Sequence, residues 1–282
     1  MQERNGVVDL LVADEAEATT AARRLLTYFQ GETADWSCAD QVALRDAIPG
    51  DRRWGYPVRR IIETLADTGS FTELRRIYGR PIITGFIRIA GKPMGLIASD
   101  CQQLGGAVDA DAAGKGARFL QLCDAFGLPV ISLVDTPGFM VGPASEAQAA
   151  VRRMSSLFVV GAGLDVPLVA IFLRKGYGLG AMALTGGSFA APVYAAAWPT
   201  GEFGGMGLEG AVRLGFKKEL EAVEDPAERE ALFDKLVAQA YEKGKATEAA
   251  THLEIDAVID PADTREVILR ALANASSDRR GG

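Results

Sequence analysis

The stretch that most constrains how this chain can fold is residues 166–189, VPLVAIFLRKGYGLGAMALTGGSF. It opens with a continuous apolar run, Pro167–Leu173, which Arg174-Lys175 ends. An unbroken apolar run of this length is typical of a strand buried on both faces, as parallel strands are. Residues 181–184 then predict the first turn of a helix. Between them, three glycines fall within five residues, at Gly176, Gly178 and Gly180.

This glycine turn is a candidate site for an anion. A strand, a tight turn and a helix start together leave backbone N–H groups unpaired and directed at one point. Glycine has no Cβ atom, so a ligand can approach such a backbone closely. The turn could bind an anion or an oxygen that becomes charged during a reaction. For one turn alone, a tight connection without any ligand is the commoner interpretation.

A second turn of this kind follows the preceding predicted strand. Helical spacing of apolar residues predicts a helix over Asp111–Phe126. Pro129–Val134 predicts a buried strand that ends in residues 135–138, Asp-Thr-Pro-Gly, and Ser145–Phe158 predicts another helix. This alternation indicates an α/β fold with a parallel sheet and covering helices. Ligands in such sheets lie beyond the carboxyl ends of the strands, so both glycine turns are expected at one edge.

The first hundred residues predict further elements. Val7–Val12 predicts a strand and residues 14–29 a helix, and Val58–Leu65 predicts a short helix. Ile82–Ile89 and Met94–Ala98 predict two strands joined by an Ala-Gly-Lys turn. That turn between two apolar runs indicates a hairpin.

Charge and composition exclude several classes of partner. The chain of 282 residues has a net charge of −7 and no basic stripe, which argues against nucleic acid. No apolar run is long enough for a membrane helix. The first residues are acidic, whereas a signal or transit peptide would be basic. Three cysteines without CxxC spacing predict reduced thiols, and a cytoplasmic location is therefore expected.

The single histidine, His252, argues against two kinds of site. A Ser-His or Cys-His hydrolase would have to use it, yet it lies between a predicted helix end and a strand, beside no obvious nucleophile. A histidine-based metal site is excluded as well, and no metal is expected. The carboxylates nearest the glycine turns are Glu202 and Glu209. Glu202 is a candidate general base, although a structural carboxylate that accepts backbone N–H bonds is the commoner role.

Two enzyme classes are suggested by single motifs. Residues 133–138, LVDTPG, resemble the metal-side motif of a GTPase, but the chain lacks GxxxxGK followed by Ser or Thr, so this interpretation fails. A crotonase-type hydratase would use paired N–H groups to hold a thioester oxygen as it becomes an enolate. It would also need one or two placed carboxylates, and the spacing of Glu202 and Glu209 does not make them a pair.

Several stretches, in order, resemble the C-terminal half of a biotin-dependent carboxyltransferase, the family of acetyl-CoA, propionyl-CoA and methylcrotonyl-CoA carboxylase β-type chains. The resemblance runs from about Gly6 to about Leu272. The stretches are IPGDRRWGYPVRRIIETLADTGSFTEL, LGGAVDADAAGKGARFLQLCDAFGLPVISLVDTPGF, RKGYGLGAMALTGGSF, AWPTGEFGGMGLEGAV and IDAVIDPADTREVILRAL. The family more often has YGGAY where this chain has YGLGAM, and the chain has no zinc-ribbon cysteine set.

The resemblance implies a crotonase-like (ClpP-like) ββα spiral and transfer of a carboxyl group from carboxybiotin to the α-carbon of an acyl-CoA. It implies that backbone amides of this half hold the biotin ureido oxygen as its negative charge rises. The donors would be those of Phe139, Gly180 and Ala181. The residues that shape the turns or bind biotin would be Asp135, Gly138, Tyr177 and Gly178.

The resemblance also predicts how the chain is organised. Residues 1–40 would be the last strand, helix and linker of the family's N-terminal half, 41–275 the carboxyltransferase C-terminal domain, and 276–282 a disordered tail. The N-terminal half carries most of the acyl-CoA site in this family. The predicted partners are therefore a separate N-half chain, without which this chain would be inactive, a biotin carboxyl carrier protein and a biotin carboxylase. An oligomer is expected as well.

Two alternatives remain beside this carboxyltransferase subunit. One is a decarboxylase subunit of the same family, which runs the transfer toward carboxybiotin. The other is a non-catalytic scaffold half-domain that assembles a carboxylase without binding biotin. A stand-alone crotonase hydratase is a third and weaker candidate. The sequence does not specify the acyl chain.

Overall fold

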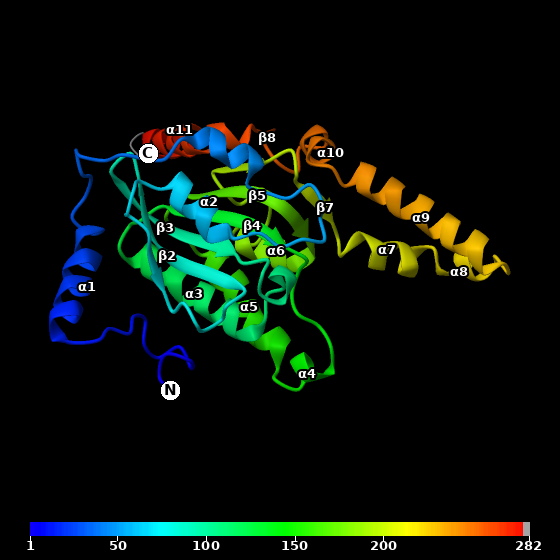
Figure 1. The fold of residues 1–282 in the computed structure, drawn as a ribbon, viewed down its shortest axis with the longest axis horizontal. Helices are drawn as coiled ribbons and strands as arrows, with labels where there is room; N and C mark the ends of the chain where they lie inside the picture. The colour runs from blue at the N-terminus through cyan, green and yellow to red at the C-terminus, as the bar shows by residue number, and fades with distance from the viewer. Residues whose placement is uncertain (279–282) are drawn as a thin grey trace.

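A mostly parallel sheet runs through the middle of the molecule (Figure 1). The computed structural model describes residues 1–278. Within them the strands are β1 (Thr72–Leu74), β2 (Ile82–Ile89), β3 (Lys92–Ser99), β4 (Val130–Thr136), β5 (Leu168–Tyr177), β6 (Tyr194–Ala197), β7 (Glu202–Gly204) and β8 (Ala257–Val258). Their order is β1-β2-β3-β4-β5-β6-β8, with β7 paired to β5. The β1–β2 and β2–β3 pairs are antiparallel and all later pairs are parallel.

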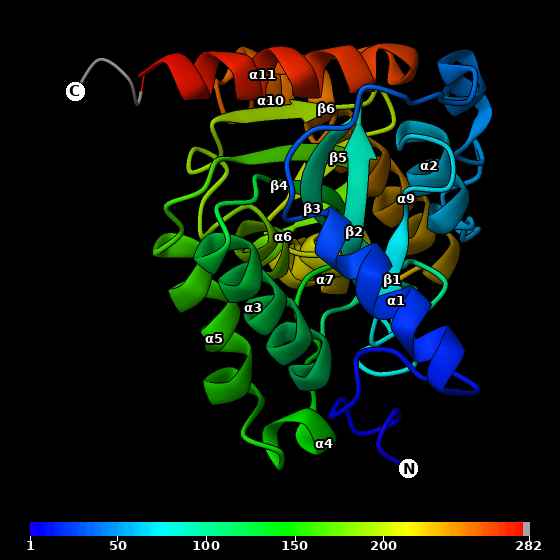
Figure 2. The same ribbon diagram turned by 90° about the vertical axis from the view of Figure 1, so that its left-hand side faces the viewer.

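Helices cover both faces of this sheet, as the α/β prediction requires. In chain order they are α1 (Glu15–Thr27), α2 (Val58–Leu65), α3 (Ala110–Ala125), α4 (Pro143–Glu146), α5 (Ala150–Ala162), α6 (Gly178–Leu184), α7 (Leu208–Gly215), α8 (Lys217–Glu221), α9 (Pro226–Lys243), α10 (Ala246–Thr251) and α11 (Thr264–Asp278). Helices α3 and α5 lie on one side of the sheet and α2 and α11 on the other (Figures 1 and 2). Helices α7, α8 and α9 extend away from the body of the molecule (Figure 1).

The apolar run of β5 is buried on both faces, as its sequence predicts. Ala170 and Phe172 lie in the core cluster that contains residues of α3 and α5. Val169 and Ile171 lie in the opposite cluster, with residues of α2 and α11. Because successive side chains of a strand point to opposite faces, a strand between two helical layers must be apolar at every position.

The local predictions in the first hundred residues are largely confirmed. Helix α2 spans Val58–Leu65, and α1 covers most of the helix predicted over residues 14–29. Strands β2 and β3 form the predicted hairpin, in which Ile89 pairs with Lys92. The Gly91 turn has a φ of +77°, and a Cβ atom there would lie 2.0 Å from a backbone oxygen of the polar segment after α1. Glycine is therefore required at this turn.

Three of the predicted elements differ from the structure. Val7–Val12 is not a strand, because it does not pair with any strand of the sheet within the described residues. Ser145–Phe158 is not one helix: Ala149, with a left-handed φ of +53°, separates α4 from α5. Strand β5 does not end at Arg174 but continues to Tyr177, and α6 begins at Gly178 rather than near Ala181. Pairing with β7 extends β5 beyond its apolar run.

The last helix of the described residues is α11, which extends to Asp278. Of the predicted tail, 276–282, residues 279–282 lie outside the described part of the chain. None of the helices within residues 1–278 is both long and apolar enough to span a bilayer. The division at residue 40 remains a prediction.

Candidate functional site: two backbone turns at one edge of the sheet

The first turn follows β4 and is shaped by Thr136 and Gly138. The Gly138 N–H donates to Thr136 Oγ1 at 3.1 Å, and this hydroxyl donates to the Gly138 carbonyl at 3.2 Å. Gly138 has a φ of +117°, which a residue with a side chain rarely adopts. The Thr136 side chain and the backbone conformation of Gly138 therefore fix this turn.

A neighbouring segment orients the amide of Phe139. Val108 N–H donates to the Gly138 carbonyl at 3.0 Å, and Met140 N–H donates to the Val108 carbonyl at 2.8 Å. Phe139 is thus the partner of Val108 in a parallel bridge. In such a pair the N–H of the bridged residue points away from the neighbouring segment. The Phe139 N–H consequently points away from Val108.

The second turn joins β5 to α6. Gly178 has a φ of +59°, and a Cβ atom on it would lie 2.7 Å from the Gly205 carbonyl oxygen. Gly180 and Ala181 follow in the first turn and a half of α6. The amides of a helix's first turn have no acceptor within the helix, so the Gly180 N–H is available to a ligand.

The two turns are in direct contact. A Cβ atom on Gly180 would lie 2.6 Å from the carbonyl carbon of Gly138 and 2.8 Å from the Phe139 nitrogen. A real Cβ atom does not approach that closely, so the contact requires glycine. The structure therefore brings Phe139 next to Gly180, about forty residues later in the sequence, and Ala181 directly follows Gly180 in α6.

Asp135 lies beneath the first turn. Its side chain is fully buried, accepts a hydrogen bond from the Lys175 N–H at 3.0 Å and forms an ion pair with Arg174 at 3.1 Å. The strand register shifts between Val134 and Thr136, which turns this carboxylate toward β5. Asp135 thus holds the two strand ends together.

Tyr177 ties the second turn to β7. Its hydroxyl donates to Glu202 Oε2 at 2.8 Å, and Glu202 Oε1 forms an ion pair with Arg52 at 3.2 Å. The Arg52 guanidinium stacks on the Tyr241 ring at 3.6 Å. Burial, followed by the charge of Glu202, raises the pKa of Tyr177 well above its usual range. Tyr177 therefore stays a hydrogen-bond donor.

The partners of Glu202 differ from those predicted for a structural carboxylate. This carboxylate accepts a phenol hydroxyl and pairs with a guanidinium, rather than accepting backbone N–H bonds. Arg52 lies in one of the stretches that carry the family resemblance, but no role was predicted from the sequence for either Arg52 or Tyr241. The pairing of β7 with β5 brings Glu202 beside Tyr177.

A cavity of about 550 Å³ opens beside the second turn. Its lining includes Gly178, Met182, Phe189, Phe203, Gly204 and His252. His252 is the exposed residue at the end of α10, as the sequence predicts for a helix-terminal histidine. The sequence did not predict that His252 lines this cavity, because α10 and α6 are distant in sequence.

Cysteine and acidic side chains do not form a metal centre within residues 1–278. No group of three or more His, Cys, Asp or Glu side chains there could hold a metal ion. Cys101 and Cys123 are buried, Cys38 is exposed, and all three are free thiols.

Comparisons with known proteins agree with this architecture. The family model of the carboxyl transferase domain matches residues 1–281. The chain is 32% identical over 287 residues to the methylmalonyl-CoA carboxyltransferase 12S subunit of Propionibacterium freudenreichii subsp. shermanii, covering 98% of this chain and 54% of that one. It is 35% identical over 297 residues to the propionyl-CoA carboxylase beta chain of Saccharopolyspora erythraea, with the same coverages. The chain thus spans about half the length of these relatives.

Solved structures show the same similarity. A single-chain, multi-domain long-chain acyl-CoA carboxylase matches with a TM-score of 0.88 and 57% identity, over 96% of this chain and 27% of that one. A hexameric transcarboxylase 12S structure with methylmalonyl-CoA and methylmalonic acid bound matches with a TM-score of 0.88 and 30% identity, over 96% and 53%. The fold is therefore of the crotonase-like carboxyltransferase type. The chain belongs to the carboxyl transferase domain family of the biotin-dependent acyl-CoA carboxylases.

Proposed function

We propose that this chain is the carboxyltransferase component of a biotin-dependent acyl-CoA carboxylase and that it supplies the biotin side of the active site. The observation that carries the proposal is the contact of two glycine turns, with a Gly180 Cβ position only 2.6 Å from Gly138. This contact supports an arrangement in which backbone amides from two strand ends would surround one point. Carboxybiotin bound there would supply the carboxyl group for transfer.

The backbone of the two turns fits a ureido oxygen. The Phe139 N–H points away from Val108 and its nitrogen lies close to Gly180, whose N–H belongs to the helix's first turn, so we expect both to donate to one oxygen. Ala181 is assigned as the third donor. Negative charge on this oxygen rises as the carboxyl group leaves, and fixed donors stabilise that charge without reorganising. One such donor contributes roughly 3 kcal/mol to the transition state.

The remaining assigned residues shape this arrangement. Gly138 and Gly178 provide the two left-handed backbone positions. Asp135 holds the ends of β4 and β5, and Tyr177 fixes the start of α6 through Glu202. None of them needs to exchange a proton.

The same proposal includes partners and substrate. The relatives that share this sequence are about twice as long, and the chain matches only about half of each. We therefore expect the acyl-CoA site to be completed by an N-half chain, and the biotin to arrive on a carrier protein that a biotin carboxylase charges. Assembly into an oligomer is expected because one similar structure is a hexamer. The free cysteines favour the cytoplasm as the compartment.

A Gly180→Val substitution tests the proposal in the complex reconstituted with its partner chains. The added side chain would push the two turns apart, so carboxyl transfer should fall at least 100-fold, since more than one donor would be displaced. Gly50→Val is the matched control, because a Cβ atom at Gly50 meets nothing within 4 Å.

The outcome separates this function from its alternatives. Full transfer activity in a folded Gly180→Val complex would mean that the chain only scaffolds a carboxylase. Net decarboxylation of acyl-CoA with loading of biotin would identify a decarboxylase subunit. Circular dichroism and thermal melting of both variants establish that the fold persists.

A further inference from the structure

Lys115 is a buried amine without a partner. It lies on α3 with a side chain that is only 1% exposed. Its Nζ atom has neither a hydrogen bond nor an ion pair with any residue of the described chain. A buried charge is costly unless it is paired, so this amine points to a ligand or to a neutral state.

Glu73 and Asp100 are the carboxylates that act on Lys115 electrostatically, and both pair with Arg59. Glu73 accepts two hydrogen bonds from Arg59, at 2.7 and 2.9 Å. Asp100 accepts a third bond from Arg59 at 2.8 Å. Arg59 bridges these two carboxylates, and neither of them forms a hydrogen bond or an ion pair with Lys115 within the described chain.

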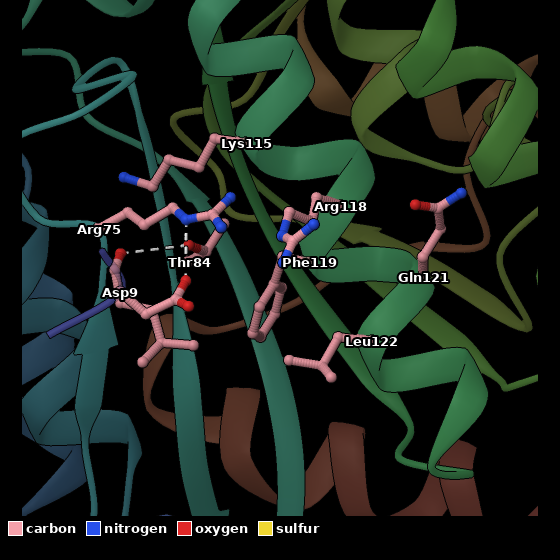
Figure 3. A pocket seen from close by; sticks show the side chains of 9 residues that line it. Asp9, Arg75, Thr84, Lys115, Arg118, Phe119, Gln121 and Leu122 are labelled. Carbon is pink, nitrogen blue, oxygen red and sulfur yellow. Dashed lines mark hydrogen bonds and ion pairs between the residues drawn. The ribbon is translucent and has the colours of Figure 1, made fainter. Parts of the chain in front are cut away.

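Lys115 lines a cavity of about 300 Å³ between α3 and strands β1 and β2 (Figure 3). Arg75 and Arg118 line the same cavity, and Figure 3 shows both guanidinium groups directed into the space between these elements. Asp9 is the one carboxylate in the lining, and its Oδ1 lies 2.8 Å from Arg75 Nε. The lining therefore carries a surplus of two positive charges.

The positions of these cations are set by the fold. Arg75 adopts a left-handed φ of +52°, and its backbone N–H donates to the Asp9 carbonyl at 2.8 Å. This contact fixes the direction of the Arg75 side chain. Arg118, one turn after Lys115 on α3, has no acidic partner within the described chain. Phe119, Leu74 and Leu122 form apolar walls, which strengthen electrostatic attraction in the cavity.

We propose that this cavity binds a small oxyanion of the phosphate type, with Lys115 as its buried donor and Arg75 and Arg118 as its other cations. A dianion would neutralise the surplus of two charges. The planar fork of a guanidinium suits the oxygens of such a group. The cavity is separate from the glycine turns, because it contains no residue of 135–140 or 177–181. The inference does not depend on the proposed function.

Isothermal titration of the full chain with inorganic phosphate tests this site, at pH 7 and constant ionic strength set with sodium chloride. Saturable binding is expected for the natural chain. Lys115→Met should weaken it at least tenfold, and Arg118→Gln, at an exposed position, should weaken it without affecting the fold. Lys235→Met, on the exposed side of α9, is the matched control and should bind as the natural chain does.

Two results would overturn the proposal. One is no saturable heat with phosphate, which would mean that water alone satisfies Lys115. The other is equal binding by the natural chain and by a folded Lys115→Met variant. A parallel titration with glycerol 3-phosphate distinguishes free phosphate from the phosphate of a larger molecule; binding of either supports the oxyanion site.

Discussion

Tyr177 connects the start of α6 to the body of the sheet through a buried hydrogen bond. Its hydroxyl reaches Glu202, which in turn pairs with Arg52. The Glu202 side chain is 12% exposed, so its carboxylate depends on these two donors for most of its solvation. A single phenol hydroxyl thus helps to hold the turn that contains Gly178.

A Tyr177→Phe substitution should lower the free energy of unfolding by about 1–3 kcal/mol, because it leaves a buried carboxylate oxygen without its donor. Urea unfolding of the full chain measures this change. Tyr241→Phe is the matched control, since it removes a hydroxyl bonded to the exposed Glu209 at 2.6 Å. Equal losses in the two variants would contradict the idea that burial decides the cost.

Asp109 connects the stability of α3 to the first turn. It is the N-cap of α3, and its carboxylate accepts the Ala112 N–H at 2.7 Å. The preceding residue, Val108, is the one that pairs with Phe139. The start of this helix and the orientation of a proposed donor therefore share one short segment.

Asp109→Ala should cost about 1 kcal/mol of stability, the typical value for losing an N-cap. Because Val108 would also lose its fixed position, we expect carboxyl transfer by the reconstituted complex to fall severalfold. Asp225→Ala removes the N-cap of α9, which lies far from the turns, and should leave transfer unchanged. Both quantities are read from urea unfolding and from a transfer assay. Unchanged transfer in Asp109→Ala would show that the pairing tolerates a frayed helix start.

Lys115 should give the whole molecule a distinctive pH dependence. Burial lowers the pKa of Lys115 from 10.5 to about 8, more than Glu73 and Asp100 raise it, and Arg59 and Arg75 lower it further. Between pH 8 and pH 10.5 the Lys115 amine keeps its proton in the unfolded chain but has released it in the folded chain. The free energy of unfolding should therefore rise with pH from about 8 to 10.5, relative to the Lys115→Met variant.

The expected rise is about 3 kcal/mol over that range, since each pKa unit corresponds to about 1.4 kcal/mol. Urea unfolding of both chains in phosphate-free buffers at several pH values measures the difference. Below pH 8 the amine is protonated in both states, and Lys115→Met should be the more stable chain. A difference between the two chains that does not vary with pH would contradict a lowered pKa.

The sequence predicted the units of this fold well where each unit is determined locally. The run Pro167–Leu173 predicted a doubly buried strand, and the neighbouring residues of β5 do face opposite cores. Helix α2 and the β2–β3 hairpin were also correct, because apolar spacing and turn glycines act over a few residues. The Val7–Val12 prediction failed for the complementary reason, since an apolar segment becomes a strand only where another strand pairs with it.

The sequence by itself determined the α/β class, the two glycine turns and the family resemblance, because these depend on residue types at short spacing. Only the tertiary structure decided that Gly180 approaches Gly138, that Glu202 meets Tyr177 and Arg52, and that Lys115 is buried without a partner. Strand pairing and helix packing set those distances. Apolar periodicity specifies which side of an element faces inward, but it does not specify which distant residue lies opposite.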